Sequence, residues 1–121
     1  MPIFRGKQIT SSNSDYKDSA RAALRSNLNL AASVSVIDGV TLNNGDRVLL
    51  VKQNSAAENG IYTWSSTTSK LTRATDADSS GDVSAGMRIY VEEGTVNAKS
   101  IWIVISTGQL TVGSSAIVFA N

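Results

Sequence analysis

Short runs of alternating apolar and polar residues divide this sequence, and glycine or asparagine separates them at intervals of about ten residues. An alternation with a period of two is typical of strands that bury one face. The only proline is Pro2, so no run contains a residue that lacks a backbone donor. The pattern predicts a mostly β protein, a single small antiparallel β-sandwich or barrel. The runs lie at 28–36, 47–53, 60–66, 71–75, 87–93 and 100–107, and one or two further strands are expected in 109–120.

Two of these runs have features that place them within the sheets. Residues 48–51, VLLV, are apolar on both faces, which predicts a central strand. In the run SIWIVIST, Ile101 and Ile103 share one face with Ile105, while Trp102 lies on the other. Asn44 and Gly45 are residues typical of a hairpin turn and are expected to connect a short run near residue 41 to the strand at 47–53.

The N-terminal part of the chain has a different pattern. Residues 14–27 are rich in alanine, with Asp15 as a possible N-cap, and predict one short helix. The first 30 residues carry five basic and two acidic side chains. At 121 residues the chain fits one domain. We therefore expect an extended N-terminal docking arm with a short helix at 1–27, followed by a β domain at 28–121.

The composition excludes several classes of chemistry. The chain has no cysteine, which excludes disulfides, thiolate nucleophiles and zinc-thiolate sites, and no histidine, which excludes Ser-His-Asp catalysis. Glycines occur singly and never in a phosphate-binding pattern. No apolar stretch is long enough to span a membrane, and the N-terminus lacks the apolar core of a secretory signal. We expect a protein that is not an enzyme, has no cofactor and is made in the cytoplasm.

An acidic loop at residues 76–82 suggests a calcium site. Counted from Asp76, Gly81 occupies the sixth position of an EF-hand loop as required, but Met87 stands where the motif needs a bidentate glutamate. The flanking segments also alternate like strands, whereas an EF-hand needs helices. The loop is interpreted as a polar turn, with an adventitious cation site as the alternative.

The few aromatic residues allow two interpretations. A chain with only seven aromatic residues needs most of them in its core. Flat aromatic faces also stack on sugar rings, so one or two of them could form a ligand-binding platform. The possible ligand-binding residues are Trp64, Tyr90 and Trp102.

An ordered series of motifs resembles a β module that recurs in virion surface proteins of tailed bacteriophages. The motifs are IDGVTL at 37–42, GDRVLLVK at 45–52, NGIY at 59–62, RATDAD at 73–78, Gly86, VEEGT at 91–95, Asn97 and Trp102. The resemblance covers about residues 28–120, and over this range the chain is similar to tail-fibre-like and capsid decoration proteins. It implies a structural or adhesive role in a particle.

Within that resemblance, a single module behind a basic arm suits an accessory protein that docks on a larger assembly. The expected function is a head decoration or cement protein in the virion, with a tail-fibre or baseplate-associated protein that binds host glycan or receptor as the alternative. The partners implied are the major capsid protein or tail proteins and further copies of the chain, with no nucleic acid and no membrane. Deletion of residues 1–26 is expected to leave a folded body. The expected partner-binding residues are Ile3, Phe4, Arg5, Lys7, Ile9, Tyr16, Arg21, Leu24 and Arg25.

Overall fold

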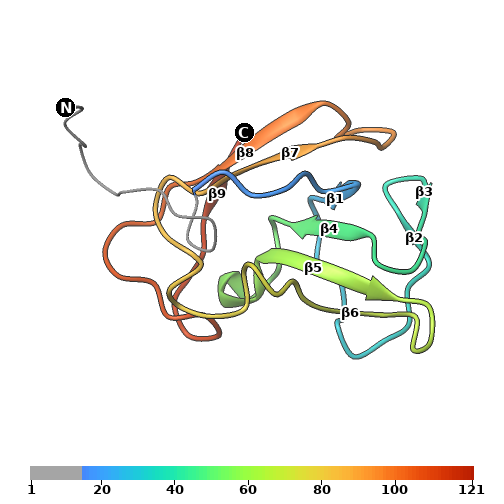
Figure 1. Ribbon diagram of the computed structural model, residues 1–121, viewed down its shortest axis with the longest axis horizontal. Coiled ribbons are helices and arrows are strands. Elements are labelled where there is room, and N and C mark those ends of the chain that lie inside the picture. The colour runs from blue at the N-terminus through green and yellow to red at the C-terminus, as the bar shows by residue number, and fades with distance from the viewer. Residues whose placement is uncertain (1–14) are drawn as a thin grey trace, which may run out of the picture.

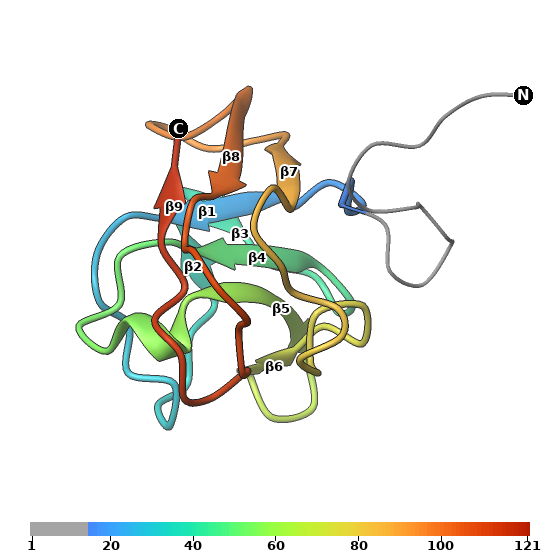
Figure 2. The same cartoon turned by 90° about the vertical axis from the view of Figure 1, so that its left-hand side faces the viewer.

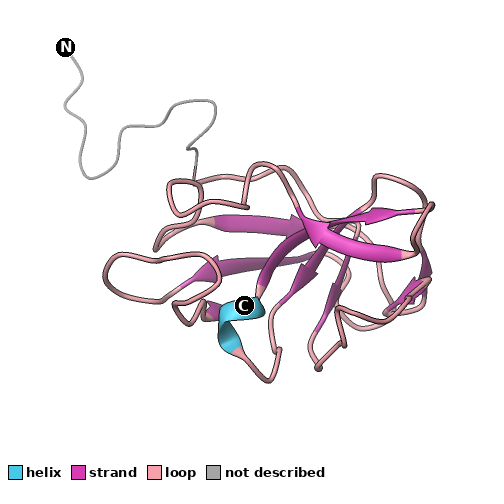
Figure 3. Cartoon of the chain, turned by 90° about the horizontal axis from the view of Figure 1, so that it is seen from below, coloured by secondary structure: helices cyan, strands magenta, loops and turns pink. Residues whose placement is uncertain are grey.

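The computed structural model describes residues 15–121, and nearly all of its regular structure is β-strand. The only helix among these residues is one 3-10 turn, η1 (Ala56–Glu58) (Figure 3). The mostly β fold class is therefore confirmed. The strands are β1 (Ala22–Leu24), β2 (Val36–Ile37), β3 (Val40–Thr41), β4 (Arg47–Leu50), β5 (Gly60–Ser65), β6 (Lys70–Arg73), β7 (Arg88–Val91), β8 (Ser100–Val104) and β9 (Phe119–Ala120).

The strands form three sheets with the orders β1-β4-β5-β6, β2-β3 and β7-β8-β9 (Figure 1). Every pairing between named strands is antiparallel except that of β1 with β4. Figure 2 shows the β7-β8-β9 sheet stacked over the sheet that contains β4 and β5. Of the two predicted alternatives, sandwich or barrel, the stacked sheets correspond to the sandwich, with one parallel strand added at an edge.

The β1-β4-β5-β6 sheet is buried on both faces, because alternate residues of β4 enter different hydrophobic cores. Leu49 belongs to the core shared with β7-β8-β9, and Val48 and Leu50 belong to a second core shared with the β2-β3 hairpin. All three are 0% exposed, which confirms the central position predicted for this run. The larger members of the first core are Leu49, Val51, Ile61, Val83, Met87, Ile89, Val91, Trp102, Val104, Leu110, Ile117 and Phe119.

The predicted helix at 14–27 is wrong over its described part, residues 15–27. Tyr16 and Ala20 form parallel bridges to β7, and β1 pairs in parallel with β4. This segment therefore joins the two large sheets along their edges. Alanine favours helices intrinsically, but tertiary packing overrides that preference. Here the small side chains of Ala20, Ala22 and Ala23 let the backbone pass between the sheets, and all three are 0% exposed.

This pairing also corrects the expected boundary at residues 27 and 28. The amide of Arg21 donates to the carbonyl of Arg47, and the amide of Glu93 donates to the carbonyl of Arg21. Residues 15–27 therefore belong to the β body. The remainder of the predicted arm, residues 1–14, lies outside the described residues.

The predicted strand at 28–36 is present only at its end, as β2. The preceding residues lack strand pairing, but Leu28, Leu30 and Val34 still pack against the second core.

Asn44 and Gly45 form the expected turn between β3 and β4, closed by the amide of Asp46 donating to the carbonyl of Asn43 at 3.0 Å, but these two strands do not pair. The hairpin turn is at Asp38 and Gly39, between β2 and β3. Both residues have positive φ, 48° and 78°, as a type I′ hairpin turn requires.

Candidate interaction surfaces

Three links between distant segments hold the sheets in place. The first joins the β2-β3 turn to the loop after β7. The Asp38 carboxylate accepts hydrogen bonds from the amides of Val96 and Asn97, the latter at 2.8 Å. The Asn97 side chain then donates to the carbonyl of Ala23 at 3.0 Å. One carboxylate and one buried amide thus connect all three sheets at this corner.

The second link joins η1 and the start of β5 to the end of β6. The guanidinium of Arg73 donates to the carbonyls of Ala57 at 2.7 Å and Asn59 at 3.2 Å. It also lies 5.2 Å from the centre of the Tyr62 ring. Burial raises the pKa of the Tyr62 phenol, and the nearby Arg73 charge partly opposes that rise.

The third link joins β4 to the acidic loop. The Arg47 guanidinium binds both carboxylate oxygens of Asp76, at 3.0 and 3.1 Å. It also donates to the carbonyls of Asp18 and Ser19, so the N-terminal segment is part of the same junction. Asp76 is therefore engaged in an ion pair. Among residues 15–121, no group of three or more acidic side chains is arranged to hold a metal ion.

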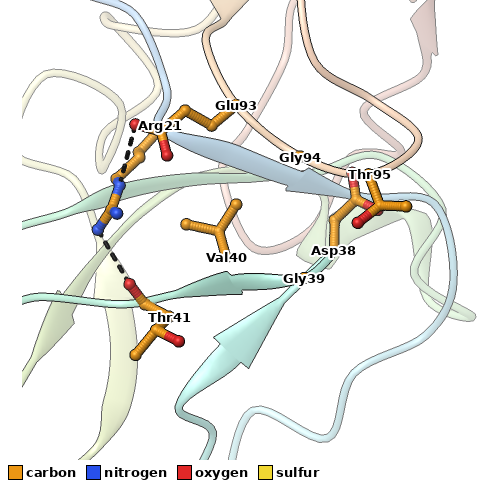
Figure 4. Close-up of a pocket in the computed structure, with 8 residues that line it drawn as sticks. All are labelled: Arg21, Asp38, Gly39, Val40, Thr41, Glu93, Gly94 and Thr95. Atoms are coloured by element: carbon orange, nitrogen blue, oxygen red, sulfur yellow. Dashed lines mark hydrogen bonds and ion pairs between the residues drawn. The ribbon is translucent and has the colours of Figure 1, made fainter.

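An open hollow of about 440 Å³ lies next to the first link (Figure 4). Arg21 crosses it and donates to the carbonyl of Thr41 and the carboxylates of Asp46 and Glu93. The hydrogen bonds that Arg21 donates, first to Asp46 and then to Glu93, raise the pKa of its guanidinium. Within the lining, Arg21 is thus held by Glu93 and by the carbonyl of Thr41. Its lining residues are Arg21, Asp38, Gly39, Val40, Thr41, Glu93, Gly94 and Thr95.

The outer side of the β7-β8-β9 sheet exposes a row of apolar side chains. Tyr90 of β7 lies opposite Ile101 of β8 in the ladder, and the two are 41% and 52% exposed. Beyond the end of β8, Ile105 donates its amide to the carbonyl of Val118, and their side chains are 54% and 42% exposed. Exposed apolar patches of this kind mark interaction sites. We call this surface the outer face and define it by Tyr90, Ile101, Ile103, Ile105 and Val118.

The expected partner-binding residues are distributed over several environments. Tyr16 is exposed beside β7, where Arg88 donates to its hydroxyl at 3.1 Å and lies 5.0 Å from its ring centre. Arg21 is engaged in the hollow, and Leu24 packs against the second core. Arg25 covers the Trp102 ring at 5.5 Å. Ile3, Phe4, Arg5, Lys7 and Ile9 lie outside the described residues.

Of the three aromatic residues considered for a ligand platform, only Tyr90 is exposed. Trp64 is 7% exposed and donates its indole N–H to the carbonyl of Val34. Trp102 is 2% exposed and donates to the hydroxyl of Ser100. Both tryptophans therefore contribute to the cores and offer no free ring face to a sugar.

The outer face is not among the sites that the sequence pattern predicted. Its signal was present in SIWIVIST, where both sides of the alternation are apolar. Apolar side chains on both faces indicate either a strand buried on both sides or a strand with one face in the core and an exposed apolar face on the other side. For β8 the second description is correct, because Trp102 and Val104 are buried while Ile101 and Ile105 are exposed.

No protein-family model, curated protein or solved structure matches this chain. In the described part of the chain, no helix has the length and apolar character needed to cross a membrane.

Proposed function

We propose that this protein is a non-enzymatic structural component of a tailed-bacteriophage virion, a head decoration protein docked on the capsid. Supporting this, motifs that lie far apart in the chain meet in space. The IDG turn at 37–39 binds the VEEGTVN loop through Asp38, and NGIY at 59–62 binds RATDAD through Arg73. GDR at 45–47 binds the same RATDAD segment through the pair of Arg47 and Asp76.

These pairings give a physical reason for the order of motifs on which the resemblance rests. The IDGVTL, GDRVLLVK, NGIY and RATDAD motifs and the segment from VEEGT to Asn97 each supply one half of a tertiary link, so these motifs describe a fold that needs all of them. This supports a resemblance to a whole module over a chance match of short strings. The motif residues hold the fold. Proteins that share such a module but bind different partners would therefore differ in the surface residues that lie between the motifs.

The docking segment in this proposal is residues 1–14, with capsid subunits as the partner. Tyr16, Arg21, Leu24 and Arg25 have contacts within the β body, so docking need not use them. Ile3, Phe4 and Ile9 would supply apolar area, and Arg5 and Lys7 would pair with carboxylates of the capsid surface.

Electron microscopy of particles from the phage that encodes the chain tests this function. Particles that lack the chain would be incubated with the full protein or with a variant that lacks residues 1–14. Many copies of the full protein on the head, and none of the variant, are expected. The double variant Arg5→Glu/Lys7→Glu keeps the segment length and should bind more weakly. Absence of the chain from purified particles would show that the proposal is wrong.

A second candidate is a tail-associated protein that binds a host glycan, and the exposed ring of Tyr90 favours it. A few copies at the tail, together with glycan binding that Tyr90→Ala removes, would support this function over decoration. Tyr90→Phe keeps the ring face and serves as the control. Binding that persists in Tyr90→Ala would exclude this platform.

A further inference from the structure

Along β7 the outer face places Tyr90 between two opposite charges, Arg88, which lies opposite Ile103 in the ladder, and Glu92. Residues 88, 90 and 92 alternate with the buried Ile89 and Val91, so Arg88, Tyr90 and Glu92 are directed to the same side of the sheet. Tyr90 forms a cross-strand pair with Ile101 of β8. Along β7 the positive charge therefore precedes Tyr90 and the negative charge follows it.

Both charged side chains have capacity for a further partner. Arg88 donates from Nε to the carbonyl of Gly86 and from one terminal nitrogen to the Tyr16 hydroxyl. The other terminal nitrogen has no acceptor within residues 15–121. Glu92 is exposed, and its carboxylate forms no ion pair within the same residues. A charge arrangement that reverses from one end to the other is complementary to itself after a half turn.

We propose that two copies of this chain pack outer face against outer face about a two-fold axis that passes beside Tyr90. In such an isologous contact, residue i of one copy meets residue j of the other, and j meets i. The half turn places Arg88 opposite Glu92 of the second copy twice, on either side of the axis. Two sheets that pack face to face with nearly aligned strands bury their facing side chains in one layer.

A second copy explains the surface better than the other occupants. With the axis beside Tyr90, packing against a second outer face removes Tyr90 and Ile101 from water, and hydrophobic burial drives association. Pairing across the axis also satisfies Arg88 and Glu92 at once, whereas an all-acidic or all-basic partner would oppose one of them. This inference concerns self-association and does not depend on the proposed place in a virion.

The test is a charge exchange followed in solution by sedimentation velocity and native mass spectrometry. Wild-type protein should show twice the 12.7 kDa chain mass. Arg88→Glu places two acidic residues at each contact and Glu92→Arg places two basic residues there. Each single variant should raise the dissociation constant by about a hundredfold, because like charges across an interface are strongly unfavourable. An equimolar mixture of the two should restore association as a heterodimer, since both contacts are again complementary.

Three further variants keep the result interpretable. Lys70→Glu changes an exposed charge on β6, away from the outer face, and should leave the dimer intact. Ile101→Ser should abolish the dimer while the circular dichroism spectrum stays native, because its side chain points outward. Deletion of residues 1–14 should not change the dimer.

Four results would overturn the inference. They are a monomeric wild-type protein, single charge variants that associate normally, a mixture that stays monomeric, and a dimer that depends on residues 1–14. The last result would assign the outer face to the N-terminal segment. A protein that is monomeric yet binds phage heads would contradict this inference and leave the proposed function in place. A dimer that binds no particle would contradict the proposed function and leave this inference in place.

Discussion

Asp38 and Gly94 touch across the corner where the β2-β3 turn meets the loop after β7. A Cβ atom at Gly94 would clash with the nearer oxygen of the Asp38 carboxylate, and the Gly94 φ angle is 137°. The same carboxylate oxygen accepts the amide of Asn97 at 2.8 Å. Close approach of the backbone at Gly94 is thus what lets one carboxylate bind the loop.

Gly94→Ala is expected to destabilise the protein by about 2 kcal/mol or more, since it combines backbone strain with displacement of Asp38. Urea unfolding monitored by tryptophan fluorescence measures the loss. Gly81→Ala is the matched control, because nothing lies within 4 Å of its Cβ position and its φ is not in the left-handed region. Equal midpoints for the two variants would contradict the role assigned to this corner.

Asn59 is the second position where a single polar side chain joins distant parts of the fold. It is 4% exposed, accepts from the amide of Gln53 and donates to the carbonyl of Ile117. Asn59→Asp removes the donor and places a carboxylate against that carbonyl. We expect a loss of about 2–4 kcal/mol, because a buried charge replaces a satisfied amide.

Thermal unfolding of Asn59→Asp should be compared with that of Asn54→Asp. Asn54 is exposed in the preceding loop, so the same change in charge occurs there without burial. The two variants have equal net charge, and a difference in their midpoints therefore reports the buried position. If both unfold at the wild-type temperature, Asn59 does not hold β9 to the body.

The period-two pattern was sufficient to predict the fold class, because burying one face of a strand leaves a local signal in the sequence. The continuous apolar run VLLV likewise placed residues 48–51 at the centre of a sheet. The N-terminal segment was misread because Ala20, Ala22 and Ala23 have the composition of a helix, while their strand conformation depends on contacts with β4 and β7. Such contacts join residues far apart in the chain and leave no local pattern.

The outer face illustrates the same limit. Alternation places Ile101 and Trp102 on opposite faces of the strand, but it does not indicate which of the two faces packs against the core. That choice depends on the sheet against which β8 packs. The charges of Arg88 and Glu92 indicate an interaction surface only when the exposure of Tyr90 and Ile101 is known from the structure.

Burial of the N-terminal alanines changes where the chain can be shortened. Deletion of residues 1–14 should leave the unfolding temperature within a few degrees of that of the full chain. Deletion of residues 1–24 removes β1 and three fully buried alanines, and it exposes the core edges of β4 and β7. We expect the shorter chain to lose its cooperative transition, as measured by circular dichroism. A cooperative transition in that chain would restore the boundary at residue 27 that the sequence suggested.

The Tyr62 phenol should make the protein lose stability at alkaline pH. Its pKa in the folded state is raised, chiefly by burial, above the value of about 10 expected in the unfolded chain. Between these two values the unfolded chain has released the proton and the folded protein has kept it. The free energy of unfolding therefore falls as the pH rises from about 10 through the folded-state pKa.

Tyr62→Phe separates this effect from other alkaline effects. Near neutral pH the variant should be less stable by about 1 kcal/mol, because the hydroxyl donates to the carbonyl of Glu58 at 2.6 Å. Above pH of about 10 the difference should shrink, since the phenylalanine has no proton to release and the variant keeps the stability that the wild type loses. Urea midpoints of both proteins, measured across this range, test the expectation. A difference that stays constant with pH would mean that Tyr62 releases its proton equally readily in the folded and unfolded chain, and that its burial has no electrostatic consequence.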